Sequence, residues 1–431
     1  MYDNIYKKIG LKSCRSNAKF KLNKSIKKFF KISAISSFSP NFSLFSNCNL
    51  NEKTFNNSFQ IEKLLKKKYK IHNCGYIFKA QLKYKNTRIY KDIFLKECPI
   101  LDPSELDIDM NLIKNNYENY IIKNTFCNHN SSHNIELLVN YLTSKLTENK
   151  VSPSFPKFYG FNSVIMKKFT YDYTDSYSDN IVNYLDNKYY QIYFKKKLNK
   201  IYLQRNNFPC LLFYMEKMEE DLFEYCKYRG KITEREWCSY IFQIIAALKV
   251  AQDYYGLSHN DLHTCNVMYV STQKTHLFYK FNNEIFKIPT YGKIIKIIDW
   301  GRATYNFNNI NGLNSVFKNS GEAFGQFILP GFINGKKYNT PNNSTDLAIF
   351  GANLLMDKHF PKTGELFTMV KSWTKYGKNK YLDVTNNSFS LYTKASNYCK
   401  NAIPKDNINK KCFQKFKHEK SKFINEWIYE I

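Results

Sequence analysis

The two stretches that decide the fold are SHNDLHTCNVM (Ser258–Met268) and KIIDWGR (Lys296–Arg302). The first contains Asp261 and, five positions later, Asn266, and the second contains Asp299 directly after a short apolar run. Either pattern alone carries little weight, because Asp and Asn are common turn residues and the chain is rich in asparagine. Their order, with a strand-like segment beside each, makes the combination specific: H-x-D-x-x-x-x-N followed by D-x-G.

The residue types in this combination suit the handling of a metal–triphosphate complex. Mg²⁺ prefers hard oxygen ligands, which the carboxylate of Asp299 and the amide oxygen of Asn266 supply. Asp261 has to stay free of metal so that it can orient an attacking hydroxyl and accept its proton. The sequence therefore predicts phosphoryl transfer from ATP, with Asp261 as the base and Asn266 and Asp299 as the metal ligands.

The composition of the 431 residues fits a globular chain of about two domains. Hydrophobic residues make up 43%, which argues against global disorder, and no apolar run is long enough to span a membrane. Lys+Arg number 65 against 36 Asp+Glu, so the formal net charge is +29. Two interpretations of this charge stay open: a surface that attracts polyanions or acidic partners, and a bias that enriches Lys, Asn, Ile, Phe and Tyr together.

Arginine forms the best bidentate contacts to bases and phosphates, yet it occurs only at positions 15, 88, 205, 229, 235 and 302. This scarcity argues against a dedicated nucleic-acid-binding protein, and no specific nucleic-acid motif is present. The eleven cysteines are odd in number and scattered, without a C-x-x-C pair, which excludes a recognisable zinc ribbon and favours an intracellular, reducing compartment. The N-terminus lacks the charged-then-apolar pattern of a secretory signal.

Hydrophobic periodicity predicts a β-rich first part and a mainly helical second part. Residues 1–60 are expected to be a basic, disordered tail, in which Lys19–Phe30 has the spacing of a short amphipathic helix and which would allow non-specific contact with polyanions. Polar stretches near 101–131, 170–207 and 271–291 are expected to be insertions, the last of them a hairpin. Strands are predicted at Gly75–Ala80, Ile89–Cys98, Pro209–Met215, Val267–Val270 and Lys293–Ile298, and helices at Asn134–Leu146, Asp221–Tyr228, Thr233–Tyr254 and Thr345–Leu355.

With these elements in place, the sequence resembles the protein-kinase superfamily, and more closely the divergent serine/threonine kinase-like proteins of large nucleocytoplasmic DNA viruses. The resemblance covers roughly residues 61–431. It implies an α+β, bilobal protein-kinase-like fold, with a small β-rich N-lobe at 61–215 and a larger, mainly helical C-lobe at 216–431. It also implies ATP and Mg²⁺ as cofactors, a protein substrate phosphorylated on serine or threonine hydroxyls, and a location in the host cytoplasm or the virion. The supporting stretches, besides the two motifs, are Ile93–Pro103, Phe155–Gly160, Gly321–Phe327 and Asn342–Gly351.

Further nucleotide-binding residues follow from this resemblance, position by position. Lys96 matches the strand lysine that contacts the α- and β-phosphates, and Glu136 matches the helix glutamate that pairs with it. Gly75 and Ile77 match the third glycine and the following apolar residue of the phosphate-covering loop. The backbone of the segment that contains Glu216 and Met218 matches the connection that binds the adenine edge.

The resemblance also implies a structural role for Asp346, which is expected to bond the backbone around His259 and Asn260. Asn260 stands where many kinases have an arginine that reads phosphorylation of the activation segment, so such a switch is not expected here. His263 replaces the lysine of serine/threonine kinases and is a candidate hydrogen-bond donor to the γ-phosphate, although its charge titrates near neutrality.

The phosphate-covering loop departs most from the family pattern, because its first two glycine positions fall on Lys70 and His72. Three hypotheses therefore stay open. The first is an active protein serine/threonine kinase, and the second is a catalytically weak or inactive pseudokinase that serves as a binding module. The third is a small-molecule phosphotransferase, in which the D-L-H-x-x-N form of Asp261–Asn266 also occurs.

Overall fold

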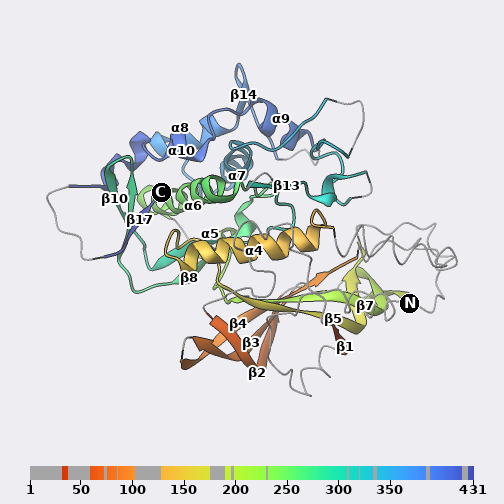
Figure 1. The fold of residues 1–431 in the computed structure, drawn as a ribbon. Helices are drawn as coiled ribbons and strands as arrows, with labels where there is room; N and C mark the ends of the chain where they lie inside the picture. Colours follow the sequence, from red (N-terminus) through yellow and green to blue (C-terminus); the bar gives the residue numbers. More distant parts are fainter. Residues whose placement is uncertain are drawn as a thin grey trace. The chain divides into compact units, whose positions relative to one another are not determined.

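The chain is a mixed α+β protein whose residues divide into two compact units (Figure 1). The computed structural model describes residues 32–36, 59–71, 75–84, 86–101, 128–174, 190–195, 199–229, 232–307, 310–319, 321–332, 337–384, 389–419 and 426–431. The first unit comprises Met1–Asn134 and Phe158–Lys217, and the second comprises Ile135–Lys157 and Met218–Ile431. The division after Lys217 lies close to the predicted one after residue 215, but most of helix α4 (Ser132–Glu148) groups with the second unit.

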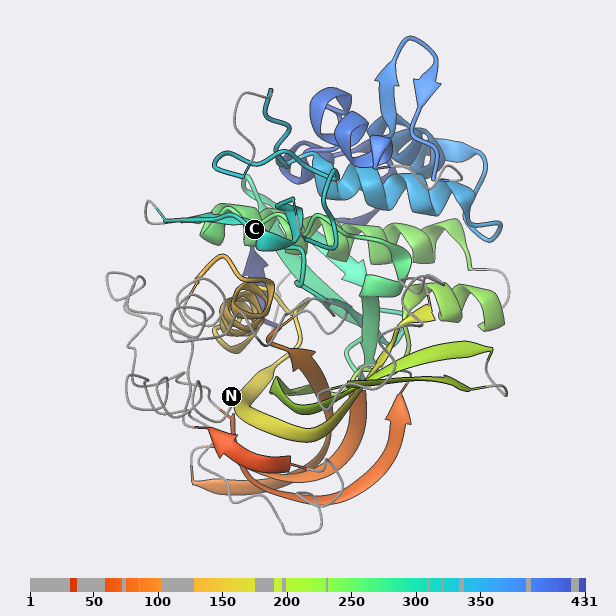
Figure 2. The same cartoon turned by 90° about the vertical axis from the view of Figure 1, so that its right-hand side faces the viewer.

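The first unit is built on a seven-stranded antiparallel sheet in the order β1-β5-β7-β4-β3-β2, with β6 paired to β7. Figure 2 shows the strong curvature of its orange strands, β2 to β4. Strand β3 places Ile77, Phe78, Ala80 and Leu82 in the core, each at 1% exposure or less. The strands are β1 (Ile32–Ser36), β2 (Phe59–Ile71), β3 (Gly75–Tyr84), β4 (Thr87–Pro99), β5 (Phe158–Asp172), β6 (Tyr190–Lys195) and β7 (Lys200–Glu216).

The strands predicted at 75–80, 89–98 and 209–215 are confirmed as parts of β3, β4 and β7. The stretch 170–207, predicted to be an insertion, contains β6 and the first half of β7. These strands form because the stretch contains a small apolar cluster, which its overall polar composition does not indicate. In this cluster, buried Tyr173 and Leu203 pack with Tyr171, Ile192 and Ile201.

The expected tail and the first insertion fall mostly outside the described residues. Within 1–60, the structure differs from the expected disorder at Ile32–Ser36, which pairs with β5, because strand pairing uses backbone groups and does not depend on the charge of the segment. Lys19–Phe30 and residues 102–127 lie outside the described part of the chain.

The second unit is centred on the long helix α6 (Glu234–Tyr255), drawn in green in Figure 1. Its start is fixed by Thr233, whose hydroxyl accepts the backbone N–H of Glu236 at 3.2 Å, and its end by Gly256 in the left-handed conformation. Every residue from Trp237 to Leu248 is buried, so α6 is a core helix surrounded by other elements. The helices predicted at 221–228, 233–254 and 345–355 are confirmed as α5 (Leu222–Arg229), α6 and α7 (Thr345–Met356), and the predicted 134–146 helix as α4.

Short strands and helices complete this unit. The strands predicted at 267–270 and 293–298 are confirmed as β8 (Val267–Ser271) and β11 (Lys293–Ile297), which pair antiparallel. Further elements are β12 (Tyr305–Phe307), β13 (Ile310–Gly312), α8 (Gly364–Trp373), β14 (Lys375–Gly377), β15 (Lys380–Tyr381), α9 (Ser390–Tyr398) and α10 (Pro404–Asn407), with short 3₁₀ turns at Thr264–Asn266, Ser315–Phe317 and Lys411–Phe416.

The hairpin predicted within 271–291 is confirmed as β9 (His276–Phe281) and β10 (Glu284–Pro289). It belongs to a four-stranded sheet, because β16 (Lys417–His418) pairs with β10, and β17 (Ile428–Glu430) pairs in parallel with β9. The ring of Phe242 on α6 lies 5.4 Å from the ring of Tyr279 and 5.1 Å from that of Phe286. The insertion is therefore packed into the core of the second unit.

Two expectations about the whole chain concern the membrane and the cysteines. In the part of the chain that the structure describes, no helix combines the length and the apolar character that crossing a membrane requires. The cysteines of that part, Cys98, Cys210, Cys226, Cys238, Cys265, Cys399 and Cys412, are free thiols.

Replacing Gly256 with alanine should destabilise the chain more than the same change at Gly331. Both glycines have positive φ, +55° and +84°, a conformation that costs an L residue about 1–2 kcal/mol. A Cβ at Gly256 would also lie 2.3 Å from the carbonyl oxygen of Asn306, whereas at Gly331 it would meet no atom of the described residues within 4 Å. Equilibrium urea unfolding measures both losses, and equal losses would contradict a steric requirement for glycine at the end of α6.

Candidate functional site

The segment that leaves α6 carries the first motif and is held by hydrogen bonds from two directions. Ser258 and Thr304 exchange two backbone hydrogen bonds of 2.9 and 3.0 Å. The buried carboxylate of Asp346, in the first turn of α7, accepts the backbone N–H groups of His259 and Asn260, each at 2.8 Å. The prediction that Asp346 bonds the backbone around these two residues is confirmed.

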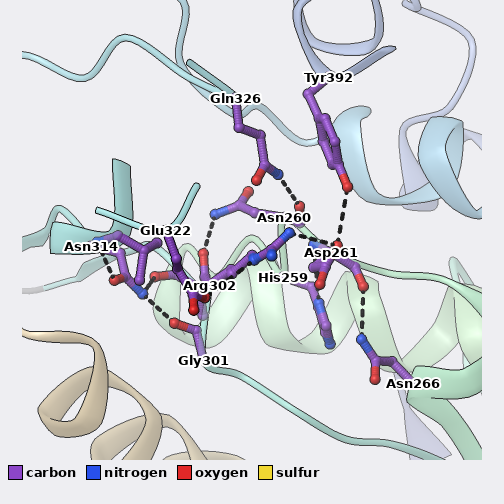
Figure 3. Close-up of polar contacts among 12 residues, drawn as sticks. His259, Asn260, Asp261, Asn266, Gly301, Arg302, Asn314, Glu322, Gln326 and Tyr392 are labelled. Atoms are coloured by element: carbon purple, nitrogen blue, oxygen red, sulfur yellow. Dashed lines mark hydrogen bonds and ion pairs between the residues drawn. The ribbon is translucent and has the colours of Figure 1, made fainter. Parts of the chain in front are cut away.

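Asn260 connects this loop to the second motif. Its φ of +68° lies in the left-handed region, which asparagine tolerates better than most residues. Its side-chain amide donates to the carbonyl of Arg302 at 2.9 Å and to the hydroxyl of Thr304 at 3.1 Å, and its own carbonyl accepts from the amide of Gln326 at 2.6 Å (Figure 3). At the position where the resemblance leads one to expect an arginine, neutral amides therefore join three segments.

His259 is fully buried and serves as a structural element of the loop. Its Nδ1 lies 3.3 Å from the backbone N–H of Asp261, and its Nε2 lies 2.8 Å from the carbonyl of Ile298. Because Nδ1 accepts a hydrogen bond, the ring proton belongs on Nε2, which donates to the carbonyl of Ile298. The ring also lies 4.8 Å from that of buried Trp300. One imidazole thereby fixes the spacing between the two motifs.

The pairing of β8 with β11 brings the backbones of the two predicted metal ligands close together. Ile297 of β11 is opposite Val267 of β8, and the next hydrogen bond runs from the Ile298 N–H to the carbonyl of Asn266 at 3.0 Å. Asp299 follows directly, with a φ of +64°. Asn266 and Asp299 therefore lie at the same end of the two-stranded β8–β11 ladder.

The side chain of Asn266 is oriented by two contacts of its nitrogen. Nδ2 donates to the backbone carbonyl of Asp261 at 2.9 Å and lies 3.1 Å from Nε2 of His263. Because both contacts use the nitrogen, the amide oxygen faces the other way, as a metal ligand requires. Burial lowers the pKa of His263, so a neutral ring that accepts this amide is favoured over a charged one. A hydrogen bond from His263 to the γ-phosphate stays a prediction.

Two carboxylates lie beside Gly301. A Cβ added to this glycine would be 3.6 Å from Oδ1 of Asp299 and 3.8 Å from Oε2 of Glu136, whose side chain is buried on α4. Among the described residues, no group of three or more His, Cys, Asp or Glu side chains forms a ready metal cluster. Mg²⁺ in phosphoryl-transfer sites is usually held by one or two protein carboxylates together with the phosphates of the nucleotide, which suits Asp299 with the Asn266 oxygen.

The predicted base, Asp261, has its carboxylate partly buried between two donors (Figure 3). Nη1 of Arg302 lies 3.3 Å from Oδ1, and the hydroxyl of Tyr392 on α9 donates to the same oxygen at 3.2 Å. Neither residue is among those whose roles were predicted from the sequence. Arg302 offered a signal, as a rare arginine directly after D-W-G, whereas Tyr392 offered none, because 131 positions separate it from Asp261.

The segment between the second motif and α7 is attached to the motif at several points. Asn314 donates from Nδ2 to the carbonyls of Gly301 and Ala303, at 2.8 and 3.1 Å. Glu322 lies 3.7 Å from Nε of Arg302, and Gln326 holds the loop as described above. Polar side chains of this segment therefore support the backbone on both sides of Arg302.

The other predicted nucleotide-binding residues are distributed over both units. In the first unit, Gly75 of β3 is opposite Lys96 of β4, and Glu216 is the last residue of β7. Gly75 has a packing reason to be glycine, because a Cβ would lie 2.2 Å from the ring of Phe94.

Ile77 of β3 is buried in the core of the same unit. Met218, also buried, begins the second segment of the second unit. Next to it, the backbone N–H of Glu219 donates to the carbonyl of Tyr269, and the backbone N–H of Tyr269 donates to the carbonyl of Glu220. The side chain of Lys70 and all of His72 lie outside the described part of the chain, and the pairing of Lys96 with Glu136 stays a prediction.

Comparisons with known proteins add no family assignment. No protein-family model matches the chain, and no curated protein matches it at a significant level. The chemical interpretation of the site therefore depends on its residues and their geometry.

Replacing Asp346 with asparagine should reduce the free energy of unfolding by about 1–3 kcal/mol, the usual cost of leaving a buried donor unsatisfied. The oxygen of an asparagine side chain can accept one of the two backbone N–H groups. Its NH₂ group would then face the other backbone N–H, so that two donors oppose each other. Asp253→Asn, at an exposed position on α6, is the matched control and should change stability by less than about 0.5 kcal/mol. Chemical denaturation of both variants makes the comparison, and equal stability would show that the loop does not depend on this carboxylate.

Proposed function

We propose that the protein transfers the γ-phosphoryl group of ATP to serine or threonine hydroxyls of proteins, with Mg²⁺ as the metal. The observation that carries the proposal is the geometry of one loop and one strand end. The Asp261 carboxylate, the Asn266 amide oxygen and the Asp299 carboxylate are supplied by two motifs that a two-stranded ladder and the buried Asp346 hold together. This is the set of groups that phosphoryl transfer needs: two oxygen ligands for metal and a separate carboxylate for the acceptor.

In this proposal the chain has three tasks. Asn266 and Asp299 hold Mg²⁺, which when bound neutralises charge on the phosphate oxygens. Lys96 contacts the α- and β-phosphates, with Glu136 as its partner, and the backbone of Glu216–Met218 binds the adenine edge. Asp261 orients the acceptor hydroxyl and takes its proton. Gly75 and Ile77 cover the nucleotide.

We infer that the sheet unit is the small N-lobe and the helical unit the large C-lobe of a bilobal protein-kinase-like fold. A protein acceptor is supported by the bonds from Asn314 to Gly301 and from Gln326 to Asn260, because a protein substrate needs an ordered surface beside the base. The relation to kinase-like proteins of large DNA viruses, and with it an intracellular location, stays part of the proposal.

A non-catalytic binding module is the second candidate, and two observations favour it. The Oδ1 atom of Asp261 already has two donors from within the chain. Lys70 and His72 stand where the phosphate-covering loop has glycines in the family. A module of this kind would bind nucleotide or a partner protein without turnover.

The test separates nucleotide binding from transfer. Purified protein is incubated with γ-labelled ATP, Mg²⁺ and casein as a generic acceptor, and a thermal shift with ATP and Mg²⁺ is measured in parallel. Asp261→Asn should lower labelling by at least about 100-fold, because a general base contributes that much or more, and should keep the thermal shift. Asp299→Asn should lose labelling and the metal-dependent part of the shift.

Asp406→Asn, at an exposed position on α10, is the control and should behave like the unaltered chain. A folded, unaltered chain that shows the thermal shift but labels nothing would replace the enzyme with the binding module. Labelling that persists in Asp261→Asn would remove this residue from the role of base. Labelling of choline or an aminoglycoside in place of casein would identify a small-molecule phosphotransferase.

A further inference from the structure

The two donors on the Asp261 carboxylate both contact the same oxygen atom. The Tyr392 hydroxyl is 3.2 Å and the Arg302 Nη1 3.3 Å from Oδ1. The other oxygen, Oδ2, is 4.0 Å from Nε2 of His263, which is beyond hydrogen-bond reach. Oδ1 is thus held by two donors from within the chain, and Oδ2 is the oxygen that can face the hydroxyl of a substrate.

Tyr392 is presented to Asp261 by packing that fixes its ring. The ring lies 6.0 Å from that of buried Phe327 and 6.2 Å from that of Phe389. Thr393, the next residue of α9, accepts a hydrogen bond from the Asn339 amide at 3.2 Å. Burial, with Asp261 adding to it, raises the pKa of the Tyr392 phenol to about 12, so the hydroxyl keeps its proton at neutral pH and acts as a donor.

Arg302 has further contacts of its own, besides those with Asp261 and the Tyr392 side chain. Its carbonyl accepts from the Asn260 side chain at 2.9 Å, and its Nε faces Glu322 at 3.7 Å. The guanidinium and the phenol thus reach one carboxylate oxygen from the D-W-G segment and from α9 (Figure 3). Two donors from different segments hold this oxygen, and a carboxylate held at one oxygen is restricted in its rotation.

We propose that Tyr392 and Arg302 are positioning residues that hold the Asp261 carboxylate so that Oδ2 faces the acceptor hydroxyl. This inference rests on the proposed function. The hydroxyl oxygen forms the new bond to the γ-phosphorus while the bond from that phosphorus to the β–γ bridging oxygen breaks, and ADP leaves with that oxygen. The hydroxyl proton passes to Oδ2 of Asp261. Neither Tyr392 nor Arg302 touches the reacting atoms.

The test is a comparison of Tyr392→Phe with Tyr398→Phe. The first change removes only the hydroxyl and keeps the ring in its packing, and the second removes an exposed hydroxyl from the end of the same helix. With casein as acceptor, Tyr392→Phe should lower kcat about tenfold and leave the KM for ATP within about twofold, because misorientation of a reacting group affects turnover more than binding. Tyr398→Phe should match the unaltered chain in both constants.

Arg302 is tested by the pair Arg302→Gln and Arg302→Lys. The glutamine should lower kcat in the same way, and the lysine, which keeps one charged donor, should recover part of the loss. Circular dichroism and a thermal melt check that each variant is folded, and Tyr392→Phe alone decides the matter if the Arg302 variants do not fold.

The outcomes separate this inference from the proposed function. Transfer by the unaltered chain with unchanged or raised kcat in Tyr392→Phe overturns the positioning role and leaves the enzyme standing. A rise in the KM for casein alone also overturns it, because Tyr392 would then contact substrate. No transfer by the unaltered chain overturns the proposed function and this inference with it.

Discussion

The hydrogen bonds from His259 and Asn260 to the buried carboxylate of Asp346 are the contact on which the rest of the site depends. They hold a loop whose backbone passes through the left-handed region at Asn260, a conformation that needs outside support. Burial raises the pKa of Asp346, and the two N–H donors oppose that rise. From this anchored backbone the His259 ring and the Asn260 amide bond the second motif, so the contacts between the two motifs depend on one carboxylate.

Side-chain amides carry much of the remaining structure of the site. Asn260, Asn266, Asn314 and Gln326 each bond a backbone carbonyl that lies beside a functional residue. An amide combines a donor and an acceptor without a charge, so these contacts do not depend on pH or on a phosphate group. An asparagine-rich composition, which in the sequence suggested only bias, has therefore been used locally to connect the loop, the D-W-G segment and the segment that follows it.

The large positive charge is separate from this arrangement. In the described part of the site the cation at the base is Arg302, one of the few arginines of the chain, and it pairs with Asp261 and Glu322. A planar guanidinium suits this position because it can address two carboxylates at once in a fixed geometry. Few of the many lysines take part in the contacts that hold the Ser258–Asn266 loop. This favours the interpretation that most of the +29 reflects a compositional bias.

The sequence by itself determined the local elements and the residues of the two motifs, because hydrophobic periodicity, capping residues and short spacings are properties of neighbouring positions. It also predicted the role of Asp346 through the resemblance to kinases, and the geometry confirmed its two bonds. Only the tertiary structure decided that Tyr392 and Arg302 share one oxygen of Asp261, and that β17 completes the sheet of the inserted hairpin. These contacts join positions far apart in the chain, and no local pattern encodes which distant side chain a folded backbone brings to a given atom.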